Sequence, residues 1–135
     1  IFSHLTALCL RHCQMGKLPA PLTLLPAVEA LDLSYSSLDD FPKELACVGS
    51  LRRLVLTGNH LGRVPRVLGG GAASRLKHLD LSLNLPFVVD HAGLAVLRSL
   101  TALTHLDLLA GIGRGVKPGA ADSEVLREAL RVLFR

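Results

Sequence analysis

The chain has 135 residues, of which 50% are hydrophobic and only 4% aromatic, and its formal net charge is +4. This length suits one domain with a real core, and the mild charge, without any run of five or six like charges, excludes a nucleic-acid-binding tail. Since no apolar run approaches the roughly 20 residues of a membrane span, we expect no membrane insertion. The dominance of leucine among the apolar residues favours internal repetition.

The N-terminal stretch IFSHLTALCLRHCQMGK has no basic region, no cleavage site and no initiator Met. It therefore indicates no signal peptide, and we interpret the chain as a fragment or a processed product. Three cysteines, Cys9, Cys13 and Cys47, form no evident disulfide framework, which favours a reducing, cytoplasmic setting. An extracellular array cut out of a longer protein is the open alternative.

Five segments align on one pattern, with apolar residues at positions one, four and six. They are LTALCLRHCQM from Leu5, VEALDLSYSSL from Val28, LRRLVLTGNHL from Leu51, LKHLDLSLNLP from Leu76 and LTHLDLLAGIG from Leu103. The gap of two between positions four and six predicts a short strand with one outward residue between two inward ones, followed by a turn. Position nine is occupied by Cys13, Ser36, Asn59, Asn84 and Gly111.

This pattern resembles the leucine-rich repeat family, whose signature is L-x-x-L-x-L-x-x-N/C-x-L, over nearly the whole chain. The resemblance implies one domain, residues 1–135, with an α/β repeat fold. This fold is a solenoid, or horseshoe, with a parallel concave β-sheet and an irregular or short helical convex side. Position nine has to satisfy buried turn backbone, a role for which Asn is well suited, Ser36 is weaker and Gly111 has no side chain. Since one unit cannot bury its own leucines, neighbours must stack.

The segments between the expected strands also share a pattern. KLPAPL, DFPKEL and RVPRVL place Pro19, Pro42 and Pro65 at one phase, which predicts tight or extended returns. This LPxxL form is similar to the intracellular repeats of Ras-group and Scribble-like proteins. The fourth return, PFVVDHAGLAVLRSL, instead predicts a helix over residues 91–99 with Asp90 as its N-cap. We expect the curvature of the array to change near residue 85.

The last segment, DSEVLREALRVLFR over residues 122–135, predicts a helix capped by Asp122 or Ser123. Its apolar face comprises Val125, Leu126, Ala129, Leu130 and Leu133. This helix is either a terminal cap or the return helix of the fifth segment with a sixth repeat cut off, and we favour the cut.

Two glycine-rich stretches imitate phosphate-binding loops. Gly111, Gly113 and Gly115 follow an expected strand, but Pro118 and a polar stretch separate them from the next helix and no βαβ unit surrounds them. LGGGAASR, residues 68–75, is not followed by the Gly-Lys-Ser/Thr of a P-loop, so we interpret it as an accommodating turn. The sequence therefore predicts no cofactor.

No constellation of side chains predicts catalysis or a metal. Cys9, His12 and Cys13 take diverging repeat positions, with Cys9 on the concave face and Cys13 in the turn, whereas a zinc site needs four converging ligands. Cys47 is expected to be buried on the return side. The histidines fall at several repeat phases, and no Ser/His/Asp or Cys/His arrangement stands out. We therefore expect a protein that is not an enzyme and has no metal site.

The concave sheet is the candidate binding surface, lined by positions two, three, five, seven and eight of each segment. Acidic and basic side chains balance there, which argues against a nucleic-acid groove. Tyr35, Arg52 and Arg53 are the strongest candidates because Tyr and Arg are over-represented in binding hot spots. The full set expected to contact a protein partner is Arg11, His12, Asp32, Tyr35, Arg52, Arg53, Lys77, His78, Asp80, His105 and Asp107.

The function that this resemblance implies is non-catalytic protein–protein interaction, in signalling or scaffolding. One alternative is the sensor or substrate-recognition part of a larger enzyme or immune-type receptor. Another is a cytoskeletal or ciliary structural component. The residues do not separate these possibilities, and they leave the oligomeric state open.

Overall fold

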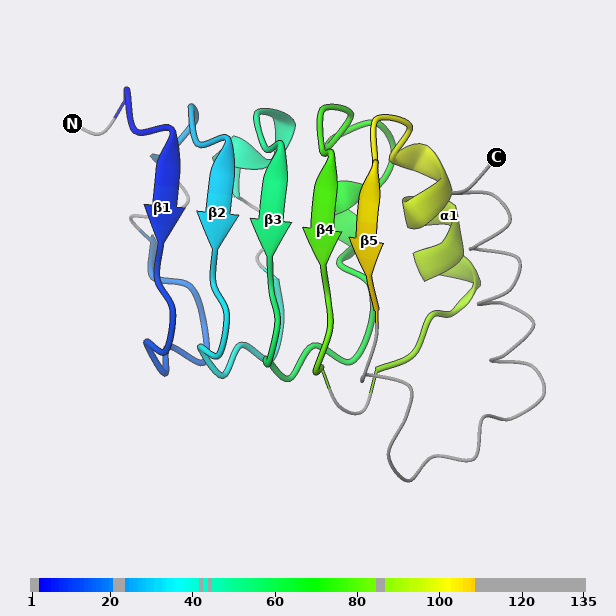
Figure 1. Ribbon diagram of the computed structural model, residues 1–135, viewed down its shortest axis with the longest axis horizontal. Helices are drawn as coiled ribbons and strands as arrows, with labels where there is room; N and C mark the ends of the chain where they lie inside the picture. The colour runs from blue at the N-terminus through cyan, green and yellow to red at the C-terminus, as the bar shows by residue number, and fades with distance from the viewer. Residues whose placement is uncertain (1–2, 21–23, 42, 44, 85–86, 109–135) are drawn as a thin grey trace.

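The computed structural model describes residues 3–20, 24–41, 43, 45–84 and 87–108. Within these ranges, five three-residue strands form one open, all-parallel sheet whose spatial order equals the chain order (Figure 1). The strands are β1 (Ala7–Cys9), β2 (Ala30–Asp32), β3 (Arg53–Val55), β4 (His78–Asp80) and β5 (His105–Asp107). This parallel sheet with little helix is compatible with the predicted α/β repeat solenoid.

The register of the sheet pairs equivalent positions of the five aligned segments. The middle residue of every strand is the leucine of position four, paired with the same leucine of its neighbours: Leu8, Leu31, Leu54, Leu79 and Leu106. Because successive strand residues point to opposite faces, positions three and five share the face opposite these leucines. We call that side of the sheet, with the residues next to it, the solvent face.

The leucines of the inner face form one continuous core. Leu54 and Leu79 are fully buried, and so are the position-one and position-six residues Leu51 and Leu56. Full burial of each leucine contributes about 1.5–3 kcal/mol relative to exposure. Leu8 is only partly buried, because β1 has a neighbouring strand on one side only. The stack therefore depends on contacts between neighbouring segments.

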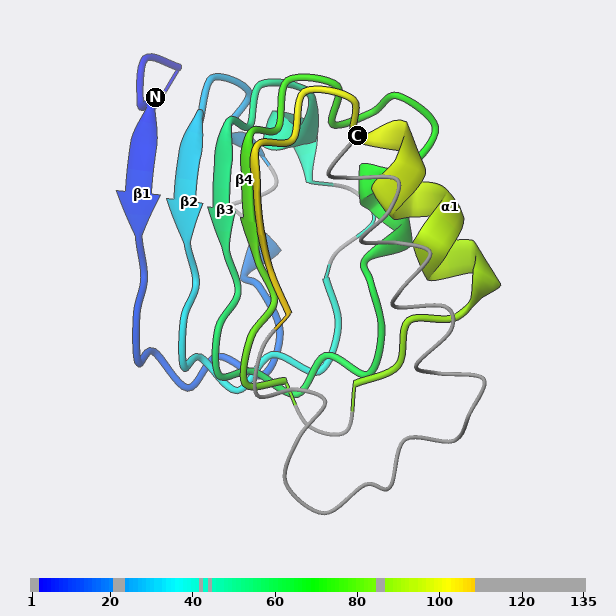
Figure 2. The same cartoon turned by 45° about the vertical axis from the view of Figure 1, so that its right-hand side comes forward.

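The return segments form a second layer behind the sheet (Figure 2). Two are tight 3-10 turns, η2 (Ala46–Gly49) and η3 (Arg66–Leu68), and the fourth return contains the helix α1 (His91–Ser99). The Asp90 side chain accepts a hydrogen bond of 2.7 Å from the Gly93 N–H, so the predicted helix and its cap are confirmed. The predicted tight returns are likewise confirmed at η2 and η3.

Buried amides at position nine connect the turns. The Asn59 Oδ1 accepts from the N–H groups of Ser36 and Leu38, each at 3.0 Å, while its Nδ2 donates to the carbonyls of Leu33 and Leu56. One segment later, the Asn84 Oδ1 accepts from the Leu61 N–H, and its Nδ2 donates to the carbonyls of Leu56 and Leu81. The predicted role of Asn at this position is confirmed, because each amide satisfies backbone of its own turn and of the preceding one.

Three predictions lie outside the described residues: the glycine loop after residue 110, the helix over residues 122–135 and the curvature change near residue 85. Residues 85–86 are not among the described ones. The turn predicted within residues 68–75 is present over residues 69–75. Among the residues that are described, no helix is both long and apolar enough to cross a membrane.

Candidate functional site

The solvent face carries the predicted partner-binding residues. All eleven are exposed or half-buried, and none belongs to the core. Three other positions that were expected to face outward are buried instead: Ser34, Val55 and Ser82, at 2%, 8% and 9% exposure. The two serines turn back onto neighbouring carboxylates, and Val55 lies between the longer side chains of its register partners on β2 and β4.

Tyr35, which lies three residues beyond the end of β2, packs its ring against residues of the neighbouring segments. Its ring stacks on that of His12, with centroids 4.9 Å apart and an interplanar angle of 3°. On the other side, a Cβ added to Gly58 would lie 2.3 Å from a Tyr35 ring carbon, so only glycine fits beneath the ring. Gly58 also has a φ of +68°, which favours glycine. Contacts with the two neighbouring segments therefore restrain the Tyr35 ring.

Ion pairs join neighbouring segments on the solvent face. The Arg52 Nε lies 3.1 Å from a carboxylate oxygen of Glu29, and the Arg11 Nε lies 3.8 Å from Asp32. These side chains are partly exposed, so each pair contributes at most about 1 kcal/mol. Their main effect is to restrain the two arginine side chains. Arg52, a predicted hot spot, therefore already has a partner on the protein itself.

Serines two residues beyond the carboxylates of β2 and β4 hold them in place. The Ser34 and Ser82 N–H groups donate to Asp32 and Asp80, at 3.0 and 2.9 Å, and both hydroxyls donate to the same carboxylate oxygens. In each case one carboxylate oxygen accepts two hydrogen bonds from the protein. These acidic groups therefore have fixed positions on the face.

Two histidines lie side by side at the start of β4 and β5. The rings of His78 and His105 have centroids 5.6 Å apart, and the Thr104 hydroxyl lies 2.9 Å from the Nδ1 of His105. Burial lowers the pKa of His78, and the nearby charge of Arg53 lowers it further. The neutral form of His78 is therefore favoured in the folded protein.

A shallow hollow of about 220 Å³ lies beside Arg53, over β1 and β2. It exists because Ala7 and Ala30 place methyl groups where β3 to β5 carry arginine and histidine. Its lining is mainly apolar, with Asp32 and Arg53 at the edge. The hollow can therefore take one apolar side chain next to a cationic group.

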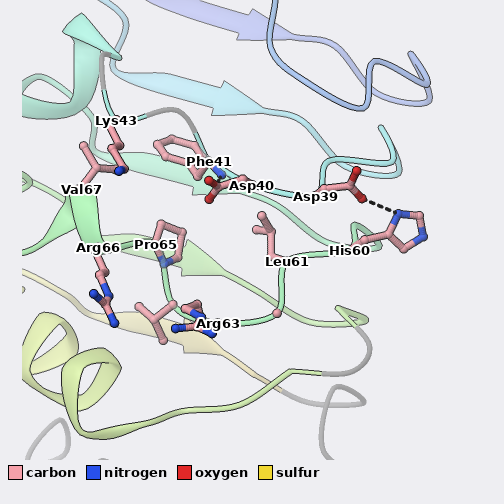
Figure 3. Close-up of a pocket in the computed structure, with 12 residues that line it drawn as sticks. Asp39, Asp40, Phe41, Lys43, His60, Leu61, Arg63, Pro65, Arg66 and Val67 are labelled. Atoms are coloured by element: carbon pink, nitrogen blue, oxygen red, sulfur yellow. Dashed lines mark hydrogen bonds and ion pairs between the residues drawn. The ribbon is translucent and has the colours of Figure 1, made fainter.

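Sequence reasoning missed a larger groove of about 550 Å³ between the second and third returns (Figure 3). Phe41, Leu61 and Pro65 line it. The His60 Nδ1 lies 3.6 Å from an Asp39 carboxylate oxygen at one end, and Arg66 lies toward the other. Its residues come from DDFPK and HLGRVPRV. A comparison of charges between the aligned returns was the one signal that could have located it.

The predicted absence of a metal site stays a prediction. Within the described residues, no group of three or more His, Cys, Asp or Glu side chains could hold a metal ion. Cys9 and Cys13 are both exposed free thiols. The Cys13 thiol lies 3.4 Å from the Arg11 carbonyl in its own turn, which agrees with its predicted turn position. Cys47 is buried on the return side, as predicted.

Comparison with known proteins assigns no family and no function to this surface. No protein-family model matches the chain, and no curated protein matches it either. Proposals about function therefore rest on the residues of the solvent face and on their surroundings.

Proposed function

We propose that this chain is a leucine-rich-repeat module of the LPxxL type that recognises a protein partner through its solvent face, without catalysis. One observation carries the proposal: strands paired at equivalent positions present charged and aromatic side chains on one side of a sheet whose other side is buried from β2 to β4. Such a preformed surface binds with little ordering cost. We place this activity in cytoplasmic signalling or scaffolding, since exposed free thiols such as Cys9 persist in a reducing compartment.

Photo-crosslinking tests this proposal without assuming the chemistry of the partner. A benzophenone amino acid is placed at the exposed Thr6 on the solvent face and, in a separate protein, at the exposed Arg75 in a turn off the sheet. In an extract of the source cells, we expect the Thr6 probe to trap a protein that the Arg75 probe does not. Trapping of the same proteins from both positions would overturn the proposal.

A charge reversal on the face provides the second arm. Arg52→Glu combined with Arg53→Glu should remove the Thr6-specific crosslink without unfolding the domain, because both side chains are exposed. Circular dichroism checks the fold. An unchanged crosslink yield would exclude these arginines from the binding surface.

A further inference from the structure

The charges of the solvent face are separated into two rows that run across the strands. Arg53, His78 and His105 are direct register partners at the first residue of β3, β4 and β5, and Arg52 and Lys77 precede two of them. We call these five residues the basic row, whose cations are Arg52, Arg53 and Lys77. Two residues further along the strands, a distance of about 6.6 Å, an acidic row contains Asp32, Asp80 and Asp107.

The two rows differ in how far the protein already satisfies them. Asp32 and Asp80 each accept two hydrogen bonds from a serine. Arg52 is paired with Glu29. By contrast, within the described ranges neither Arg53 nor Lys77 has an ion-pair partner. A guanidinium offers five donors and an ammonium three, so the unused hydrogen-bonding capacity of the face is that of cations.

The hollow over Ala7 and Ala30 extends this cationic centre on its β1–β2 side. Neighbouring parallel strands lie about 4.8 Å apart, so the hollow over β1 and β2 lies two to three strand spacings, about 10–14 Å, from Lys77 on the β4 side. An extended peptide covers that distance with about four residues. One apolar side chain in the hollow and two carboxylates on Arg53 and Lys77 are therefore within reach of a single short segment.

From this juxtaposition, and resting on the proposed function, we propose that the solvent face binds a short extended acidic peptide segment of its protein partner. Its carboxylates pair with Arg53 and Lys77, and an apolar residue within about four positions of them enters the hollow over Ala7 and Ala30. Carboxylate pairs with Arg and Lys are charge-assisted, which makes them the strongest polar contacts that this face offers.

Fluorescence polarisation with synthetic peptides tests this inference on the full chain. The probes are a labelled peptide with one leucine followed by glutamates, the same peptide with lysines in place of glutamates, and the same peptide with glycine in place of leucine. We expect binding of the acidic leucine peptide, weaker binding of the glycine peptide, and no binding of the lysine peptide. Higher salt should weaken the binding.

Matched variants identify the surface. Arg53→Glu with Lys77→Glu should lower the affinity at least about tenfold, whereas Lys17→Glu with Arg75→Glu, the same change of net charge at exposed positions away from the sheet, should leave it nearly unchanged. Ala30→Leu fills the hollow and keeps every charge. It should weaken binding of the leucine peptide but not of the glycine peptide.

Three results would overturn this inference: no binding of the acidic peptide, equal binding of the lysine peptide, or equal losses in the two double-charge variants. If the Thr6 crosslink to a partner persists in that case, the proposed function stands and only the acidic-peptide assignment fails. Loss of both the crosslink and the peptide binding would remove the function as well.

Discussion

At the residue scale, position nine shows how one side chain links two segments. Asn59 and Asn84 have both an acceptor and a donor, so each amide accepts from backbone N–H of the preceding turn and donates to carbonyls of both segments. Ser36 has one hydroxyl, which donates to the Leu10 carbonyl at 2.8 Å. The backbone N–H of Ser36 donates to the Asn59 side chain instead. The amides therefore carry more of the polar stabilisation than the serine.

Asn59→Ala should lower the free energy of unfolding by about 2–4 kcal/mol, since it leaves buried backbone groups without partners. Urea denaturation measures this loss. His60→Ala, at the exposed neighbouring position, should change stability by less than about 0.5 kcal/mol. Equal effects of the two substitutions would contradict the role assigned to the Asn59 amide.

His78 should make the stability of the fold depend on pH. Burial and the Arg53 charge lower its pKa in the folded state, so as pH falls through about 6.5 the unfolded chain takes up the proton first. Stability is thus lost on acidification below that value. His78→Gln should reduce the loss measured between about pH 7.5 and about pH 5.5, a range around the ordinary histidine pKa. His4→Gln, at an exposed position, serves as the control.

At the element scale, the helix α1 depends on its cap and on packing against η3. Leu94 and Leu97 are buried, and Gly93 lies so close to the third return that an added Cβ would be 3.2 Å from Val64. The helix has only nine residues, too few for stability in isolation, so tertiary contacts maintain it.

Asp90→Ala should destabilise the domain by about 1 kcal/mol, because the Gly93 N–H loses its acceptor. Asp90→Asn keeps an acceptor and should cost only a few tenths of that. Arg63→Ala separates the cap from the long ion pair with Asp90, 3.9 Å, and should have little effect. Thermal melts compare the three variants. An Asn variant as unstable as the Ala variant would contradict the capping role.

At the scale of the whole molecule, the buried residues form one continuous core that shields the Cys47 thiol from solvent. Cys47 is 1% exposed, and burial raises the pKa of its thiol. Cys9 and Cys13 are exposed on the first segment. The three thiols therefore report separately on surface access and on opening of the core.

A thiol reagent should label two cysteines rapidly in the native protein and the third only as the core opens. Denaturant should make all three react together. Cys47→Ala should abolish the slow phase and leave the fast one. Labelling of Cys47 as fast as that of Cys9 would show that the return side opens independently of the stack.

Much of the fold could be predicted because its causes are local in sequence. Apolar residues at positions four and six of each segment placed Leu54 and Leu79 on the inner face and located the strands around them. A polar residue just before an apolar stretch with helical period located Asp90 as a helix cap. The solvent exposure of residues such as Arg53 follows from the same two-residue alternation.

The sequence by itself determined which residues face inward, where the strands lie and which return is helical, because periodicity and capping act over a few neighbouring residues. Only the tertiary structure decided that Arg52 pairs with Glu29 while Arg53 stays available, and that two alanines leave a hollow beside it. The groove between the returns is a further example. These features join residues of different segments, so they arise only when the strands stack in a definite register.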